Sequence, residues 1–238
     1  YEPSPKDIQA IGKSDLFVYT GGDSDEWVDG MLSSIDKSKL KTLKMMDTVK
    51  LYEEEMSEGM QEEEHEHHHD DKDRHEEDKD HHHDEDKEHH HDDKEHHHHD
   101  GEEGPEMDEH VWTSPANAIQ IVKALTETIS GLDKDNAQTY QKNAEAYIAK
   151  LEKLDKDFHD VIDHAKRKEI IVGDRFPFLY FAKEFGLTYY AAFPGCSTDT
   201  EANPATIAFL VDKVKEDHIP VVFHIEMSNE QMLSLIHI

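Results

Sequence analysis

The sequence has 238 residues, of which 35% are hydrophobic and 34% charged, and its net charge is −31. Its length suffices for one large domain or two lobes. Because binding to phosphate or to anionic lipid requires clustered Lys and Arg, this acidity argues against nucleic acid and anionic membrane surfaces as partners.

The first 52 residues have the pattern of an α/β unit. Residues 16–19 (Leu-Phe-Val-Tyr) form a short apolar run that predicts a buried strand, and Gly21 and Gly22 close it. Residues 27–32 indicate a short helix, and residues 42–46 a second strand. This part is predicted to be the remainder of an N-terminal lobe.

Residues 53–109 form an insert of low sequence complexity. They contain 28 acidic and 5 basic residues, a net charge of −23, which leaves −8 for the rest of the chain. A degenerate His/Asp/Glu/Lys repeat runs through the insert with too few apolar residues to form a core. We expect this insert to be a disordered loop, because it cannot offset the entropy of ordering.

Two helices are predicted after the insert. Ser114 and Pro115 form a helix-start signal, Ser as N-cap and Pro at the first helical position. Residues 110–134 are expected to return to the N-terminal lobe. Apolar residues then recur every three or four positions from Ala137 to Ile162, predicting a linking helix over residues 135–167. Counted to Lys166, it is roughly 48 Å long at 1.5 Å per residue and suits a rigid spine between two lobes.

Strands and helices alternate from residue 168 to the end, which predicts a C-terminal lobe with a parallel sheet. In such sheets, ligands bind outside the carboxyl ends of the strands. The expected strands cover residues 169–172, 189–193 and 221–226, and the expected helices cover residues 178–185 and 204–216.

Histidine is the most conspicuous residue of the insert, which holds 15 of the 21 histidines of the chain. Imidazole and carboxylate are ligands for zinc and neighbouring divalent ions, so the clusters indicate metal contact rather than only a solvated acidic linker. Without a fixed scaffold, each such site would be weak and exchangeable. The low-affinity candidates are His65, His67, His68, His69, His75, His81, His82, His83, His89, His90, His91, His96, His97, His98 and His99.

His110 stands between the insert and the next helix, in the stretch Asp-Glu-His-Val-Trp-Thr-Ser-Pro over residues 108–115. By itself, a His at this place is as readily a capping or packing residue as a metal ligand.

That stretch resembles the "HxW-S-P" motif of the cluster A-I solute-binding proteins, the zinc and manganese binders of ABC importers. Residues 1–5 (Tyr-Glu-Pro-Ser-Pro) are similar to the family's "H-x-YEP-[ST]-P" motif, and residues 16–27 to its "ADLFVYNG…W" segment. A His/Asp/Glu-rich loop between these motifs is typical of the zinc members. The match covers nearly the whole chain in the correct order and has a Gram-positive character.

The resemblance implies an α/β fold of two lobes with parallel sheets, bridged by one long rigid helix, with the metal held between them. It implies no catalysis: the protein captures an ion outside the membrane and delivers it to an ABC transporter permease. It also implies a cell-surface lipoprotein or a periplasmic protein, which we expect to be monomeric. The chain is expected to be a fragment with an incomplete C-terminal lobe over residues 168–238.

Carried over by position, His110 matches a metal ligand of the family, and another family ligand would precede Tyr1. The family's "[HE]-x-AF-x-YF" stretch corresponds to residues 173–181 here, which lack a His, so Asp174 is the nearest candidate there. Glu226, at the end of the last expected strand, is an alternative carboxylate ligand, and His224 shares its strand parity.

Zinc is the expected ion, since imidazole suits it, and manganese is the alternative within the family. A second hypothesis is a buffering or storage protein in which the histidine tract is itself the function. A zinc hydrolase is disfavoured, since the sequence contains no HExxH motif, nucleophile elbow or phosphate loop.

Overall fold

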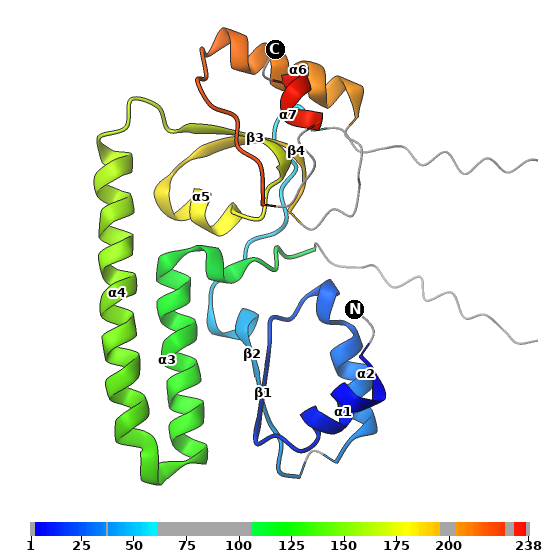
Figure 1. Ribbon diagram of the computed structural model, residues 1–238, viewed down its shortest axis with the longest axis vertical. Coiled ribbons are helices and arrows are strands. Elements are labelled where there is room, and N and C mark those ends of the chain that lie inside the picture. Colours follow the sequence, from blue (N-terminus) through cyan, green and yellow to red (C-terminus); the bar gives the residue numbers. More distant parts are fainter. Residues whose placement is uncertain (1–2, 37, 61–105, 196–202, 227–230, 237–238) are drawn as a thin grey trace, which may run out of the picture. The chain divides into compact units, whose positions relative to one another are not determined.

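Two small parallel sheets and two long helices dominate the fold (Figure 1). A computed structural model describes residues 3–36, 38–60, 106–195, 203–226 and 231–236. The α/β class with parallel strands and a long helix, predicted from the sequence, is confirmed.

The first sheet pairs β1 (Leu16–Tyr19) in parallel with β2 (Lys41–Lys44). Helices α1 (Pro5–Ile11) and α2 (Trp27–Ser34) supply its apolar cover, with Val28, Met31 and Leu32 buried against residues from α1 and β1. Helix α1 is not among the predicted elements, although Ser4 and Pro5 start it in the same way as the Ser-Pro signal at residue 114, and Ser4 and Asp7 form a capping box.

Helices α3 (Pro115–Leu132) and α4 (Ala137–Asp163) follow each other and pack side by side (Figure 1). Ser114 caps α3 as predicted, its Oγ accepting the N–H of Asn117 at 3.1 Å. In the turn, the Tyr140 hydroxyl donates to Asp133 Oδ2 at 2.7 Å. The 27 residues of α4 give a length of roughly 40 Å. Within the described ranges, no helix is both long enough and apolar enough to cross a bilayer.

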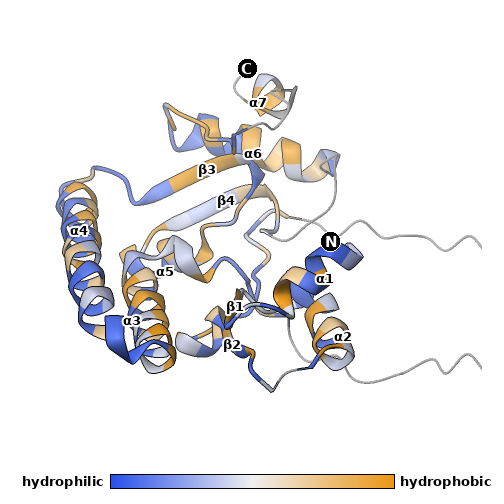
Figure 2. Ribbon diagram, turned by 60° about the horizontal axis from the view of Figure 1, so that its bottom comes forward, coloured by the Kyte–Doolittle hydropathy of each residue, from blue (hydrophilic) through white to orange (hydrophobic). Residues whose placement is uncertain are grey.

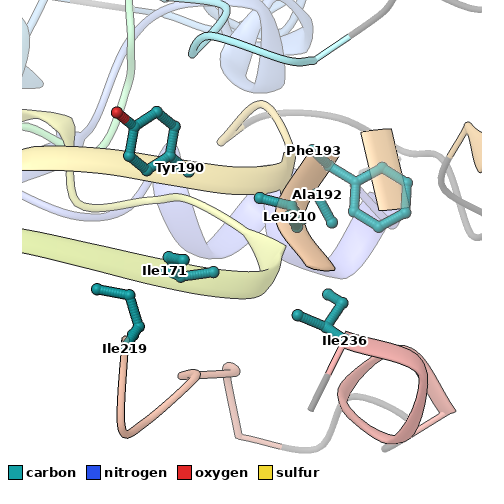
Figure 3. Packing of buried hydrophobic residues seen from close by; sticks show 7 residues of the cluster. All are labelled: Ile171, Tyr190, Ala192, Phe193, Leu210, Ile219 and Ile236. Atoms are coloured by element: carbon teal, nitrogen blue, oxygen red, sulfur yellow. The ribbon is translucent and has the colours of Figure 1, made fainter. Parts of the chain in front are cut away.

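The second sheet pairs β3 (Glu169–Arg175) in parallel with β4 (Thr188–Phe193). Between the strands lies α5 (Leu179–Phe185), and α6 (Pro204–Glu216) and α7 (Gln231–Ile236) follow. The middle of β3 is strongly apolar, as Figure 2 shows. Figure 3 shows the buried cluster that β3 and β4 form with residues of α6, α7 and the segment after α6, made of Ile171, Tyr190, Ala192, Phe193, Leu210, Ile219 and Ile236.

The prediction of a strand over residues 221–226 is wrong, because the structure forms no extended strand there. A single bridge joins Phe223 to Val172 in parallel, with Phe223 donating to the Ile171 carbonyl and accepting from the Gly173 N–H, both at 2.8 Å. Val221 and Phe223 are 51% and 52% exposed. Since strands are stabilised by packing on their faces, this exposed segment keeps only a minimal pairing.

The two ends of the His-rich insert belong to the folded part of the chain. Glu53 and Met107 form an antiparallel bridge, and the Glu54 N–H donates to the Glu106 carbonyl at 2.8 Å. The predicted disorder of the insert, and its fifteen histidines, fall on residues 61–105, which lie outside the described residues.

Candidate metal site

His110 is held at a fixed point of the backbone by the burial of the residue that follows it. Val111 is completely buried and packs in a cluster with Met46, Ile121 and Tyr180. His110 itself precedes the short 3₁₀ turn Val111–Thr113, and its side chain is 21% exposed. The ring therefore lies at the surface of a rigid segment.

A buried carboxylate lies directly against the His110 ring. Asp108 is 1% exposed, and its Oδ1 accepts the backbone N–H of His110 at 2.8 Å. The same oxygen lies 3.3 Å from His110 Nδ1. Nδ1 is buried and has no hydrogen bond of standard geometry to the residues that the structure describes. The exposed part of the ring must therefore belong to its other atoms.

The carboxyl edge of the β3–β4 sheet meets this pair. Gly195 follows β4, and a Cβ built on it would lie 3.1 Å from Asp108 Oδ2 and 3.5 Å from His110 Cε1. The same Cβ would lie 2.9 Å from the carbonyl oxygen of Phe176, the residue that follows β3. His110 thus lies where ligands of parallel sheets bind, as the sequence predicts.

Asp174, the second candidate ligand, lies near the same end of β3 and is 4% exposed. Its two oxygens accept backbone N–H groups, Oδ1 from Arg175 at 2.8 Å and Oδ2 from Ile225 at 3.3 Å. These bonds anchor the segment that carries His224 and Glu226 beside β3. A metal ion at Asp174 would share a carboxylate that already binds the backbone.

Glu226 and His224 flank the residue that Asp174 anchors. Both are exposed, and Glu226 lies in a turn rather than on a strand. His224 lines a cavity of about 740 Å³, whose other walls include Trp112 and Phe176 and are almost entirely apolar. Among the described residues that line this cavity, His224 is the only candidate ligand.

The structure brings Asp174 next to the segment of His224 and Glu226, and it brings His110 next to Asp108. Within the ranges described above, no three His, Cys, Asp or Glu side chains lie close enough together to hold a metal ion. His110, Asp174 and Glu226 thus share one edge of the second sheet and do not converge on a single point.

Negative charge gathers near His110. Burial raises the pKa of Glu106, and the neighbouring carboxylates of Glu54, Asp23 and Glu109 raise it further. Glu109 is itself buried, and its Oε1 accepts the N–H of Ser24 at 2.6 Å. Clustered carboxylates attract cations to this region.

Sequence reasoning missed Asp108, whose Oδ1 lies 3.3 Å from His110 Nδ1, and Gly195, where a Cβ would lie 3.5 Å from His110 Cε1. Asp108 had a usable signal, because an Asp two residues before a His can bond back to its N–H. No signal in the sequence pointed to Gly195, because this residue lies 85 positions after His110 and meets it only through the fold.

Known zinc-binding proteins are similar to this chain over nearly its whole length. Zinc-binding lipoprotein AdcA of Streptococcus pneumoniae (strain ATCC BAA-255 / R6) is 31% identical over 98% of this chain and 39% of its own length. High-affinity zinc uptake system protein ZnuA of Bacillus subtilis (strain 168) is 33% identical over 98% of this chain and 61% of its own length. The chain therefore spans between about two fifths and three fifths of these relatives.

Solved structures of two such proteins also match this chain over nearly its whole length. The Zn(II)-bound ZnuA-like domain of Streptococcus pneumoniae AdcA matches with a TM-score of 0.64 and 28% identity, covering 98% of this chain and 68% of that one. The metal-dependent lipoprotein YcdH from Bacillus subtilis matches with a TM-score of 0.67 and 28% identity, covering 100% of this chain and 71% of that one.

The resemblance inferred from the motifs around residues 1–5, 16–27 and 110–115 is thereby confirmed. The family consists of zinc-uptake components and not of enzymes, in agreement with the expectation of no catalysis. The family model "Zinc-uptake complex component A periplasmic" matches residues 1–237, and the chain belongs to this family.

Proposed function

We propose that this chain captures zinc outside the cytoplasmic membrane and delivers it to the permease of an ABC-type importer. The observation that carries the proposal is the His110 ring, set against a buried carboxylate at the carboxyl edge of a parallel sheet. The relatives, which are zinc-binding lipoproteins and a zinc uptake protein by name, support the choice of ion and of compartment.

His110 is the first ligand in this proposal. Because its Nδ1 is buried against Asp108, the metal reaches the ring through Nε2. Zinc in proteins is usually four-coordinate with His, Cys and carboxylate ligands, so Asp174 and Glu226 are the proposed oxygen ligands. Closing of the β3 edge on His110 around the ion would draw them together, as binding proteins close on their ligands.

The fifteen histidines of the insert are proposed to be a low-affinity collector or an occupancy sensor. Their residue types suit divalent zinc, and the two ends of the insert are joined only a few residues from His110.

Calorimetric zinc titration of the full-length protein tests both parts of the proposal. The variants are His110→Ala, a deletion of residues 61–100, and His159→Ala as a matched control, since His159 is a half-exposed imidazole on α4. We expect one tight site that survives the deletion and the control substitution. In His110→Ala we expect its affinity to fall by more than the ~10–100-fold that loss of an outer-shell partner costs.

Two other outcomes would change the assignment. If the deletion removes all binding and His110→Ala changes nothing, the protein is a histidine-tract buffer. If manganese binds at the tight site more strongly than zinc, the chain is a manganese-binding member, for which the carboxylate of Asp174 would be the informative ligand.

A further inference from the structure

We propose that Tyr180 and Asp108 act as positioning residues for His110 and fix the ring nitrogen that it offers to zinc. This inference rests on the proposed function, because it assumes that His110 is a metal ligand. The family resemblance assigns no role at the metal site to Tyr180 or Asp108. The inference gives each of them a separate physical task.

Tyr180 fixes the backbone of Asp108. It lies on α5, is 1% exposed, and its hydroxyl donates to the Asp108 carbonyl at 2.8 Å. The same hydroxyl accepts the Tyr52 N–H at 3.3 Å, so its proton and an acceptor site are both used. Because Asp108 N–H also donates to the Tyr52 carbonyl at 3.0 Å, the backbone of Asp108 is held on both sides.

Asp108 in turn fixes His110. Its Oδ1 receives the His110 N–H and lies 3.3 Å from Nδ1, so the carboxylate faces the Nδ1 side of the ring, although the two atoms make no hydrogen bond of standard geometry. A carboxylate next to Nδ1 favours the tautomer with the proton on Nδ1 and leaves the lone pair on Nε2. Outer-shell carboxylates of this kind orient metal-binding imidazoles and raise their basicity.

Gly195 completes the enclosure from the β4 side. A Cβ at this residue would lie 3.1 Å from Asp108 Oδ2, so the absence of a side chain lets the loop pack directly on the carboxylate. This contact excludes water from the oxygen that does not face His110. Exclusion of water strengthens the electrostatic interaction between the carboxylate and the ring.

Two variants of the full-length protein test the inference. Asp108→Asn keeps an oxygen that can accept the His110 N–H and removes the charge. Tyr180→Phe removes one oxygen and keeps the ring in its apolar cluster. The matched control is Tyr140→Phe, which removes a hydroxyl that bonds Asp133 in the turn between α3 and α4.

The first readout is zinc affinity, measured by competition with a chelator of known affinity. We expect Asp108→Asn to lower it about 10–100-fold, Tyr180→Phe by roughly three- to tenfold, and Tyr140→Phe not at all. The second readout is the ¹⁵N chemical shift of the His110 ring in the metal-free protein. It should show the Nδ1–H tautomer in the parent protein and a shift toward Nε2–H in Asp108→Asn.

Wild-type affinity and tautomer in both variants, together with loss of the site in His110→Ala, would overturn the positioning role and leave the proposed function intact. No effect of His110→Ala would instead overturn the proposed function. If circular dichroism shows that Asp108→Asn is unfolded, the Tyr180→Phe variant tests the positioning role alone. A purely structural role of the Tyr180 hydroxyl would lower the melting temperature without changing the His110 tautomer population.

Discussion

Glu109 and Gly22 lie in such close contact that a Cβ at Gly22 would be 2.6 Å from Glu109 Cγ. Gly22 also has a φ of +79°, a conformation that L side chains rarely adopt. The Glu109 carboxylate occupies the place of the missing side chain and accepts the Ser24 N–H. The segment that leads into His110 is therefore fitted directly to the loop after β1.

The first prediction follows from this contact. Gly22→Ala should lower the free energy of unfolding by at least about 1–3 kcal/mol, the cost of a backbone conformation (φ 79°, ψ −169°) that is essentially restricted to glycine, with the clash added. Chemical denaturation measures the change. Gly30→Ala is the matched control, because no atom lies within 4 Å of a Cβ there and the residue is inside α2. The Gly30→Ala substitution should raise the free energy of unfolding by roughly 0.5–1 kcal/mol.

The second prediction concerns pH and Glu184. Burial raises the pKa of Glu184, and the nearby carboxylate of Asp155 raises it further, although Ser114 and the Ala116 N–H bond the carboxylate and lower it. A raised pKa in the folded state means that the contribution of this group to stability is complete below its unfolded pKa. That contribution is lost as the pH rises through the folded value.

Glu184→Gln should therefore raise the melting temperature at pH 7, since Gln keeps an acceptor for Ala116 without the charge. Below about pH 4, where an unfolded Glu is itself protonated, the variant and the parent should unfold together. Thermal scans across this range measure the difference. Glu152→Gln, at an exposed position of α4, should show no such trend, and an equal gain at both ends of the range would contradict the assignment.

The third prediction concerns the core of the second sheet. Leu210 on α6 is completely buried in the cluster of Figure 3, so Leu210→Ala should lower the free energy of unfolding by about 2–5 kcal/mol. Val161 on α4 is 68% exposed, and Val161→Ala should change it by less than about 0.5 kcal/mol. Urea denaturation of both variants measures the contrast.

The fourth prediction links metal to stability. Free zinc at one hundred times its dissociation constant should stabilise the full-length protein by about 2.7 kcal/mol, provided that the unfolded chain does not bind it. Calorimetric scans with zinc and with chelator measure this increment. It should disappear in His110→Ala, while a deletion of residues 61–100 should preserve it. An increment that follows the insert instead of His110 would favour the buffering hypothesis.

Local signals in the sequence predicted most elements of the fold. Ser114 and Pro115 start α3 as expected, and Gly186 ends α5 in the left-handed conformation that glycine favours. The strands at residues 16–19 and 189–193 were found from short apolar runs. The segment at 221–226 has the same apolar character and pairs through one bridge only, because its outer face has no packing partner within the described residues.

The sequence predicted His110 as a residue of the candidate site, but it did not predict the residues that contact the His110 ring. The His-x-Trp motif points to His110, whereas the partners of its ring are set by tertiary contacts. Tyr180 reaches Asp108 from 72 positions away and would be assigned to the apolar core by any reading of its helix. Whether Asp174 and Glu226 bind the metal with His110 stays a prediction.

The bridge between Glu53 and Met107 has a consequence for the length of the histidine tract. Because both ends of the insert are fixed to each other in the folded part, a change in the length of the insert alters the entropy cost of loop closure by only about 0.6 kcal/mol for each doubling. Histidine clusters can therefore be duplicated or lost with little effect on the folded part of the chain. The proposed metal capacity of the tract and the architecture of the proposed tight site are therefore free to change independently.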